Sequence, residues 1–247
     1  MKKTIGYTII LCFVFLFVSK TFAQIDIDIE TGAVFSGYND VRIPGDQGTL
    51  FSLSEELEAD PGAFYRIRLI YNFNDRHHLF GLYAPLSINS TGQLDRDLIF
   101  EGETFPADTP LETIYKFNSY RLTYRYDFIR RDKIDIGIGF TGKIRDAKIA
   151  VKGGGLESEK TNVGFVPIIH FRLLWQYSEN FAFLLNGDAL AAPQGRAEDV
   201  HTALVYKLSD RIDLRAGYRF VEGGADNDEV YNFALINYAS IGAIFHF

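Results

Sequence analysis

Apolar and polar residues alternate along the last segment of the chain, YASIGAIFHF, up to the final residue. One face of an extended strand would carry Ala239, Ile241, Ala243, Phe245 and Phe247, and the other Tyr238, Ser240, Gly242, Ile244 and His246. Successive side chains of a β-strand point to opposite sides, whereas loose termini usually fray into small polar residues. The pattern therefore predicts that this segment is a structural β-strand.

The same period of two recurs along most of the chain, and no segment after residue 24 has the helical period. Four short polar turns, in YNFNDRHHLF, YDFIRRDKIDI, WQYSENFAF and YKLSDRIDL, alternate with longer segments at residues 38–61, 90–113, 150–160, 191–198 and 222–230. The layout predicts ten strands, at residues 25–37, 63–73, 78–89, 114–128, 133–148, 161–177, 181–190, 200–208, 211–221 and 231–247. Short turns on one side, long loops on the other and an even strand number predict an all-β fold, a closed antiparallel transmembrane β-barrel.

The two faces of the predicted strands differ in kind. In one strand, Ile67, Leu69 and Tyr71 alternate with Arg66 and Arg68. A secreted β-sandwich would also alternate, but a solvated polar face should be rich in Lys, Glu and Ser, and here Arg is frequent. Aromatic residues gather beside the short turns, as in the interfacial girdle of transmembrane barrels. We predict a lipid-interface girdle formed by Tyr71, Phe73, Tyr126, Phe128, Trp175, Tyr177, Tyr206, Phe245 and Phe247.

The first 23 residues have the pattern of a cleaved signal peptide. Lys2 and Lys3 precede an apolar run from Ile5 to Val18, and Ala23 is a small residue suited to cleavage. The run is short for a membrane anchor, and Leu11 is too large for a lipoprotein cleavage site before Cys12. We predict a signal peptide at residues 1–23 and one barrel domain at residues 24–247.

The chain that remains after this cleavage has neither Cys nor Met, which excludes disulfides and cysteine chemistry. Removal of the three lysines of residues 1–23 changes the formal net charge from -7 to -10. So acidic a chain is not expected to bind nucleic acid.

In lipid a sheet persists only without free edges, so the last predicted strand must pair with the first. On the whole chain after residue 23, and on the terminal ASIGAIFHF, the sequence resembles the bacterial small outer-membrane β-barrel family. The resemblance implies location in the bacterial outer membrane, short turns on the periplasmic side, and contact with outer-membrane lipid and lipopolysaccharide. It also implies recognition of Phe247 by the barrel-insertion machinery. We expect a monomer.

The inward face of the predicted barrel is charged, and we expect its charges to pair, because isolated charges in a narrow lumen are costly. Strand one is acidic where strand two carries Arg66 and Arg68, and Arg121 and Arg125 are expected near Asp135. The predicted lumen network comprises Asp26, Glu30, Arg66, Arg68, Arg121, Arg125, Asp135, Arg172, Arg215 and Arg219, with Asp28, Asp127, Lys143, Arg145, Asp188, Lys207 and Asp213 also facing inward. One interpretation is a salt-bridged plug; the other is a narrow pore with an anion-favouring ladder of arginines.

Ten strands is also the number in the omptins, which are outer-membrane proteases. Asp188 and His201 are candidates for a catalytic pair, since a short connection should place them nearly opposite each other. We do not expect this chain to carry the omptin pattern, which combines clustered acids with an Asp and a His two residues apart. Ser240 and His246 lie six residues apart on one strand, too far for a Ser–His pair. Asp226, Asp228 and Glu229 are candidate cation ligands without a calcium-loop spacing, and no cofactor is expected.

These observations favour a structural, adhesion or ligand-binding role, exerted through acidic extracellular loops and a salt-bridged lumen. A narrow porin-like channel for small solutes is the first alternative. A surface hydrolase similar to an omptin or a lipid A deacylase is the second.

Overall fold

The computed structural model describes residues 24–193 and 195–247, so the predicted signal peptide lies outside the described residues. Within them the chain forms strands and turns, and no helix is long and apolar enough to cross a membrane. The strands are β1 (Gln24–Arg42), β2 (Phe51–Ser52), β3 (Glu58–Ala59), β4 (Gly62–Asn72), β5 (His77–Ala84), β6 (Ser87–Gly92), β7 (Leu98–Phe100), β8 (Glu103–Phe105), β9 (Leu111–Arg131), β10 (Ile134–Gly153), β11 (Leu156–Gln176), β12 (Phe181–Ala192), β13 (Gly195–Ser209), β14 (Ile212–Asp226) and β15 (Tyr231–His246).

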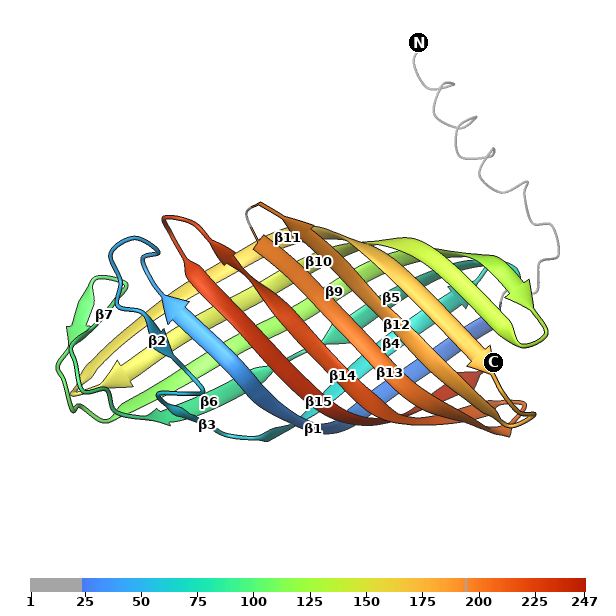
Figure 1. Ribbon diagram of the computed structural model, residues 1–247, viewed down its shortest axis with the longest axis horizontal. Helices are drawn as coiled ribbons and strands as arrows, with labels where there is room; N and C mark the ends of the chain where they lie inside the picture. Colours follow the sequence, from blue (N-terminus) through green and yellow to red (C-terminus); the bar gives the residue numbers. More distant parts are fainter. Residues whose placement is uncertain (1–23, 194) are drawn as a thin grey trace, which may run out of the picture.

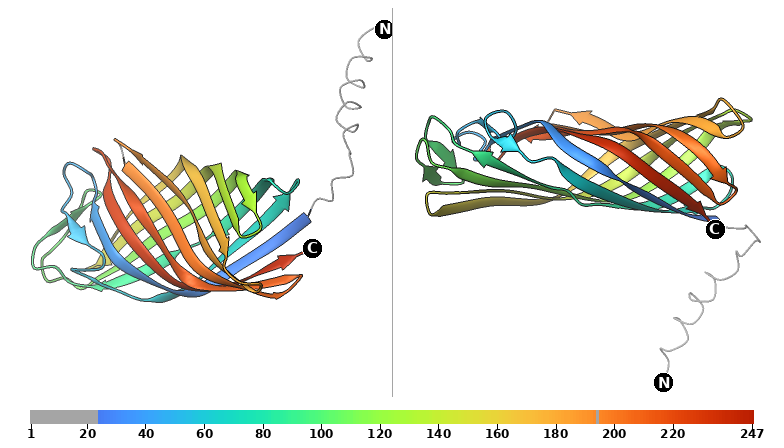
Figure 2. Two further views of the ribbon diagram at one scale, coloured as in Figure 1. Left: turned by 45° about the vertical axis from the view of Figure 1, so that its right-hand side comes forward. Right: turned by 90° about the horizontal axis from the view of Figure 1, so that it is seen from below.

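Ten strand positions close into an antiparallel barrel, which confirms the predicted fold (Figures 1 and 2). Its wall follows the order β1, β4, β5, β9, β10, β11, β12, β13, β14 and β15, and β6 continues the position of β5 beside β9. β15 pairs with β1 from Asp26↔His246 to Arg42↔Tyr231. The amide of Phe247 donates to the carbonyl of Ile25 at 3.0 Å, so the terminal segment belongs to the sheet as predicted.

Three of the five predicted long loops are wrong, because the strands continue through them. β10 and β11 stay paired as far as Gly153↔Leu156 and turn through Gly154 and Gly155. Both glycines have positive φ (56° and 82°), as the tight hairpin turn of type I′ requires. β12 and β13 pair up to Ala192↔Gly195, and β14 and β15 up to Asp226↔Tyr231. The four short turns lie where the sequence predicts them.

The other two long segments, residues 43–61 and 93–110, fold over the end of the barrel opposite the C-terminus (Figure 1). They carry the small strands β2, β3, β7 and β8, and β10 and β11 extend to the same end. A continuous apolar core, called the loop core below, joins the loops to the wall and includes Val41, Ile43, Phe51, Leu53, Leu57, Leu98, Phe100, Phe105, Tyr115, Ile149, Val151 and Ile236. Sequence alternation did not predict this core.

A bulge in β1 lets one strand line two different interiors. The pairing with β15 shifts between Ser36 and Tyr38, and such an extra residue reverses the faces beyond it. Below the bulge Asp28 and Glu30 face the lumen, and above it Asn39 and Val41 are buried. The strand thereby contributes charge to the lower half of the barrel and an apolar side chain to the loop core.

The outer wall is apolar between two rows of aromatic residues. At the short-turn end, Tyr71 contacts Phe73, and Trp175, Tyr177, Phe181 and Tyr206 follow one another along the rim. A second row, formed by Tyr65, Tyr83 and Tyr120 on three neighbouring strands, was not predicted. Large apolar side chains such as Leu69, Leu122 and Phe140 stay more than half exposed between the rows. Such a belt is suited to lipid.

Candidate functional site

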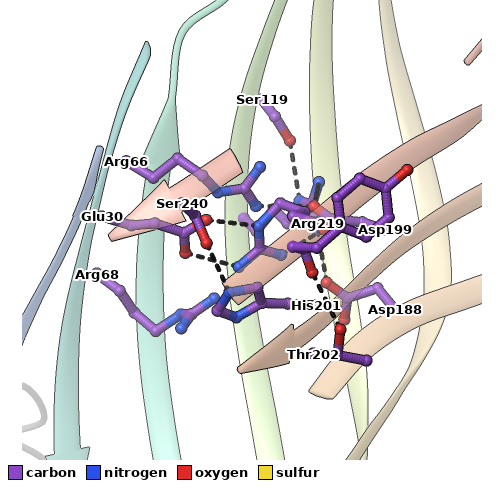
Figure 3. A network of polar contacts seen from close by, with 12 residues as sticks. Glu30, Arg66, Arg68, Ser119, Asp188, Asp199, His201, Thr202, Arg219 and Ser240 are labelled. Atoms are coloured by element: carbon purple, nitrogen blue, oxygen red, sulfur yellow. Dashed lines mark hydrogen bonds and ion pairs between the residues drawn. The ribbon is translucent and has the colours of Figure 1, made fainter. Parts of the chain in front are cut away.

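The middle of the lumen is filled by a layer of paired charges, centred on Asp199 of β13 (Figure 3). Its carboxylate accepts from Arg66 at 2.7 Å and from Arg219, and a guanidinium nitrogen of Arg121 lies 2.7 Å from it. These guanidinium groups come from β4, β9 and β14, so one carboxylate ties together distant parts of the wall. The charged layer, as used below, comprises Asp28, Glu30, Arg66, Arg68, Arg121, Asp188, Asp199, Arg215 and Arg219.

The acids of β1 hold the other arginines of the charged layer. Glu30 accepts from Arg219 at 2.7 Å and from Arg215 at 3.0 Å. Asp28 accepts from Arg215 and from Arg68, the latter at 2.8 Å, as the sequence predicts for strands one and two. Gly242 of β15 leaves room for this arrangement, since a Cβ there would lie 2.9 Å from Nε of Arg215. Charged hydrogen bonds of this kind make the burial of so many ions tolerable.

The predicted pair of Asp188 and His201 does not form. β12 and β13 are paired in a register that places Asp188 opposite Asp199, and His201 opposite Asn186. Asp188 accepts instead from Arg121 at 2.6 Å, from the hydroxyl of Thr141 at 2.7 Å and from Nδ1 of His170 at 3.0 Å. These contacts make Asp188 a member of the charged layer.

His201 contacts Ser240, a neighbour that the sequence did not predict. Its Nε2 lies 3.0 Å from Oγ of Ser240, which is two strands away on β15 (Figure 3). His201 is 0% exposed, and its Nδ1 has no hydrogen-bond partner in the part of the chain that the structure describes. A substrate cannot reach this hydroxyl, and no carboxylate orients the ring, so the pair is structural.

The chain does carry an Asp and a His two residues apart, which corrects the expectation from sequence. Asp199 and His201 both face the lumen from β13. The predicted strand begins at residue 200, so Asp199 lies just outside it; extending the alternation by one residue places Asp199 on the inward face. Three guanidinium groups occupy its carboxylate, which leaves it no freedom to act as a base.

A second charged group lies nearer the short-turn end, around Asp127 of β9. Its carboxylate accepts from Nε of Arg125 at 2.8 Å, and Nε2 of His78 lies 2.9 Å away. Gly137 provides the space, because a Cβ there would lie 2.1 Å from Oδ1 of Asp127. Arg121 and Arg125 thus pair with Asp188, Asp199 and Asp127, and the expected contact of these arginines with Asp135 is wrong. No ion pair of Asp135 is found in residues 24–193 and 195–247.

Asp26 and Asp213 bracket one histidine near the same end. Nδ1 of His246 lies 2.9 Å from Oδ1 of Asp26, and Nε2 lies 3.1 Å from Oδ2 of Asp213. The three residues come from β1, β14 and β15, which are neighbours in the wall. This side of the lumen is therefore acidic, and it faces the β9–β11 side across the barrel.

Below the charged layer the lumen widens into a cavity of about 550 Å³, called the vestibule, which is lined by Asp26, Arg68, Asn72, His78, Phe80, Arg125, Asp127, Asp135, His170, Arg172, Asn186, Asp213, Arg215 and His246 among others. Glu30, Arg66 and Asp199 do not line the vestibule and are 2–5% exposed. The charged layer therefore closes the inner end of the vestibule, and the loop core fills the lumen on the other side of the charged layer.

The candidate cation ligands form no such site. Asp226 ends β14, and the side chain of Asn227 accepts from the amides of Glu229 and Val230 to form a turn. No group of three or more His, Asp or Glu residues suited to a metal ion occurs in the part of the chain that the structure describes.

No protein-family model matches the chain, and no curated protein matches it. Among solved structures it is similar to the outer-membrane protease OmpT of Escherichia coli, with a TM-score of 0.56 and 10% sequence identity over 91% of this chain and 97% of OmpT. The chain has the fold of a small bacterial outer-membrane β-barrel. At 10% sequence identity, the similarity of this outer-membrane barrel to OmpT concerns the fold alone.

Two further barrels match with lower scores. Ail of Yersinia pestis has a TM-score of 0.41 and 11% identity over 91% of this chain and 99% of Ail. Neisserial surface protein A has a TM-score of 0.34 and 15% identity over 89% of this chain and 96% of that protein.

Proposed function

We propose that this outer-membrane barrel does not conduct solutes and that it acts by binding at the cell surface, through the loops that the loop core holds in place. The observation that carries the proposal is the double obstruction of the lumen. Arg219, Asp199 and Glu30 are buried across its middle, and Phe51, Phe100 and Phe105 are buried beyond them. An anion-conducting ladder would need guanidinium groups that face open water.

The loops have the order that a binding surface needs. Arg96 links them, because its guanidinium donates to Glu56 at 2.6 Å and to the carbonyl of Leu50 at 2.8 Å. β10 continues for nine residues past Ile144, and β11 begins nine residues before its partner Phe165, which is about 30 Å at the usual rise of a strand. A folded platform therefore stands above the lipid-facing belt.

The charge of the platform indicates the class of partner. Residues 43–61 and 93–110 carry ten acids and one base, Arg96. A surface of this sign attracts cationic partners and repels anionic ones. We therefore propose a basic protein or peptide as the ligand.

Planar-bilayer recordings of the refolded chain test the first half of the proposal. The expected result is the absence of discrete ion steps, because the charged layer leaves no open path. Regular single-channel steps in repeated preparations would contradict it and favour the small-solute channel.

Binding of polylysine to the refolded chain in nanodiscs tests the second half. We expect substitution of the exposed Glu55, Glu58 and Asp95 by their amides to weaken binding about tenfold, since three charges near one ligand are lost. The control replaces three exposed acids of the opposite end, Asp75, Asp132 and Asp210. Equal weakening by both sets would mean that net charge alone is responsible.

No observation favours the hydrolase. Asp188 is the candidate that the sequence offers, and its carboxylate is engaged by an arginine, a threonine and a histidine. An Asp188→Asn variant should leave unchanged any activity toward lipid A or peptides that the refolded chain displays.

A further inference from the structure

We propose that the vestibule binds a small organic anion from the periplasmic side, with the acid group of the ligand held between Arg125 and Arg172. This inference does not depend on the proposed function of the loops, because the vestibule lies at the other end of the barrel, below the charged layer.

The first observation is an excess of cationic groups over close acidic partners on one wall. Arg125 and Arg172 flank the carboxylate of Asp127. Arg125 donates to it at 2.8 Å, but the nearest nitrogen of Arg172 is 3.9 Å away, which is too far for a hydrogen bond. No closer ion pair of Arg172 occurs in the described ranges. Its planar fork of N–H groups, which suits a carboxylate or a phosphate, is thus free to bind one.

The second observation is two unsatisfied polar atoms on the same cavity wall. His170 and Asn186 line the vestibule and are 3% and 7% exposed. Among the described residues, Nε2 of His170 and Oδ1 of Asn186 have no hydrogen-bond partner. Buried polar atoms are nearly always satisfied, so these two indicate a ligand that also carries a hydroxyl or another polar group.

An aromatic ring holds this wall in place. Phe80 packs edge-on against the ring of His170, with centroids 5.2 Å apart. The guanidinium groups of Arg68 and Arg125 lie 5.4 and 5.9 Å from its centroid. Nδ1 of His170 is held by Asp188 of the charged layer. The site is therefore preorganised by contacts that exist without a ligand.

The volume of the vestibule and the uneven distribution of charge on its walls also suit a small organic anion. A volume of about 550 Å³ lies within the usual range of small-molecule sites. The acids Asp26 and Asp213 are engaged by His246 on the opposite wall. Asp75 and Asp210 lie at the exposed mouth, where water and salt screen them. On the β9–β11 wall, Asp135 also lines the vestibule, so two acids, Asp127 and Asp135, face three arginines, Arg125, Arg130 and Arg172. An anion would therefore settle beside these arginines.

Isothermal titration calorimetry of the refolded full chain tests the proposal, with citrate and pyrophosphate as separate probes at constant ionic strength. Arg172→Gln should weaken binding about tenfold or more, as expected for loss of a charge-assisted hydrogen bond. Arg130→Gln is the matched control, because Arg130 lines the same vestibule at its rim and pairs with the exposed Asp75. This control should change the affinity by less than about twofold, as for a screened surface charge.

A second variant keeps the test decisive if Arg172→Gln does not refold. Asn186→Ala removes the unpartnered Oδ1 without changing charge, and should also weaken binding while the barrel keeps its native migration in unheated gel samples. Binding of citrate alone or of pyrophosphate alone supports the proposal and assigns the acid group as carboxylate or phosphate. Absence of binding of both probes at millimolar concentration overturns it, as does equal weakening by Arg172→Gln and Arg130→Gln.

Discussion

At the scale of single residues, Asp199 carries the greatest number of ionic contacts in the charged layer. Three guanidinium groups converge on its carboxylate, and all four side chains are at most 5% exposed. Removal of one partner from a buried ionic cluster is far more costly than loss of a surface ion pair, because the remaining charges stay buried and uncompensated.

We expect Asp199→Asn to lower the free energy of unfolding by about 3–5 kcal/mol, the range for broken buried ion pairs. Urea unfolding in lipid vesicles, followed by the fluorescence of the sole tryptophan, Trp175, measures this. Asp135→Asn is the control, since Asp135 lines the lumen and forms no ion pair with any described residue, and should cost less than about 1 kcal/mol. Similar losses in both variants would show that the convergence on Asp199 is not stabilising.

At the scale of elements, β10 shows how a strand makes room for its neighbour. Gly137 and Gly139 face the lumen, where β9 places Arg125 and Asp127. Because glycine lacks a Cβ, the long charged side chains of β9 can lie across β10. The small residues of one strand thus decide where the charges of the next one lie.

Gly137→Ala should therefore destabilise the barrel by about 1–3 kcal/mol, the usual cost of overpacking. The added Cβ would collide with Asp127 at 2.1 Å and with Cδ of Arg125 at 2.9 Å. Gly81→Ala is the matched control, because its Cβ would meet only a backbone oxygen at 3.9 Å. That control should be neutral or slightly stabilising, and the same urea titration compares the two; an equal effect of both would contradict the explanation.

The contact between Arg96 and Glu56 makes the loops outside the barrel wall sensitive to pH. The hydrogen bond from Arg96 holds the pKa of Glu56 below its ordinary value. A lowered carboxyl pKa stabilises the loops above the ordinary value of 4.5, and the contribution is lost as the pH falls through the lowered pKa. In Arg96→Gln the pKa of Glu56 should rise toward its ordinary value, measured by carbon-13 titration of the carboxyl group. An unchanged pKa would show that Arg96 does not hold this carboxylate.

At the scale of the whole molecule, the lumen is closed at two levels, and a different kind of interaction forms each closure. The charged layer depends on ion pairs between wall strands, and the loop core depends on apolar burial between loops and wall. Within the described residues, every ion pair of the charged layer joins wall strands and none involves residues 43–61 or 93–110, so one closure should survive loss of the other.

Replacement of residues 95–107 by a short Gly-Ser linker should leave the barrel folded and still non-conducting. The wall pairing of β6 with β9 lies outside the deleted segment, whereas Leu98, Phe100 and Phe105 would be lost from the loop core. We expect faster cleavage of residues 43–61 by an added protease, because that loop loses its packing partners. Conductance in the shortened chain would show that the charged layer alone does not close the lumen.

The alternation of apolar and polar residues predicted the barrel and the residues that face its lumen. It could do so because lipid and lumen impose opposite polarity on successive residues. The alternation did not predict which charged residues form ion pairs, since pairing depends on how the side chains fit together across the lumen. Arg68 does bind Asp28, its neighbour in register, whereas Arg66 lies opposite Glu30 and binds Asp199 across the barrel. The loop core was also missed, because residues 43–61 and 93–110 follow no single period. The sequence around Gly154 resembles a loop although it is one hairpin turn.

The partners within the charged layer are far apart along the chain, and this constrains how the barrel can be assembled. Arg66 is 133 residues from Asp199, and Arg219 is 189 residues from Glu30. A hairpin that entered the hydrocarbon alone would expose bare guanidinium groups to lipid, at a cost of several kcal/mol each. Sequential insertion of hairpins is therefore unfavourable, and the order of events must bring the first and last strands together before the sheet crosses the bilayer.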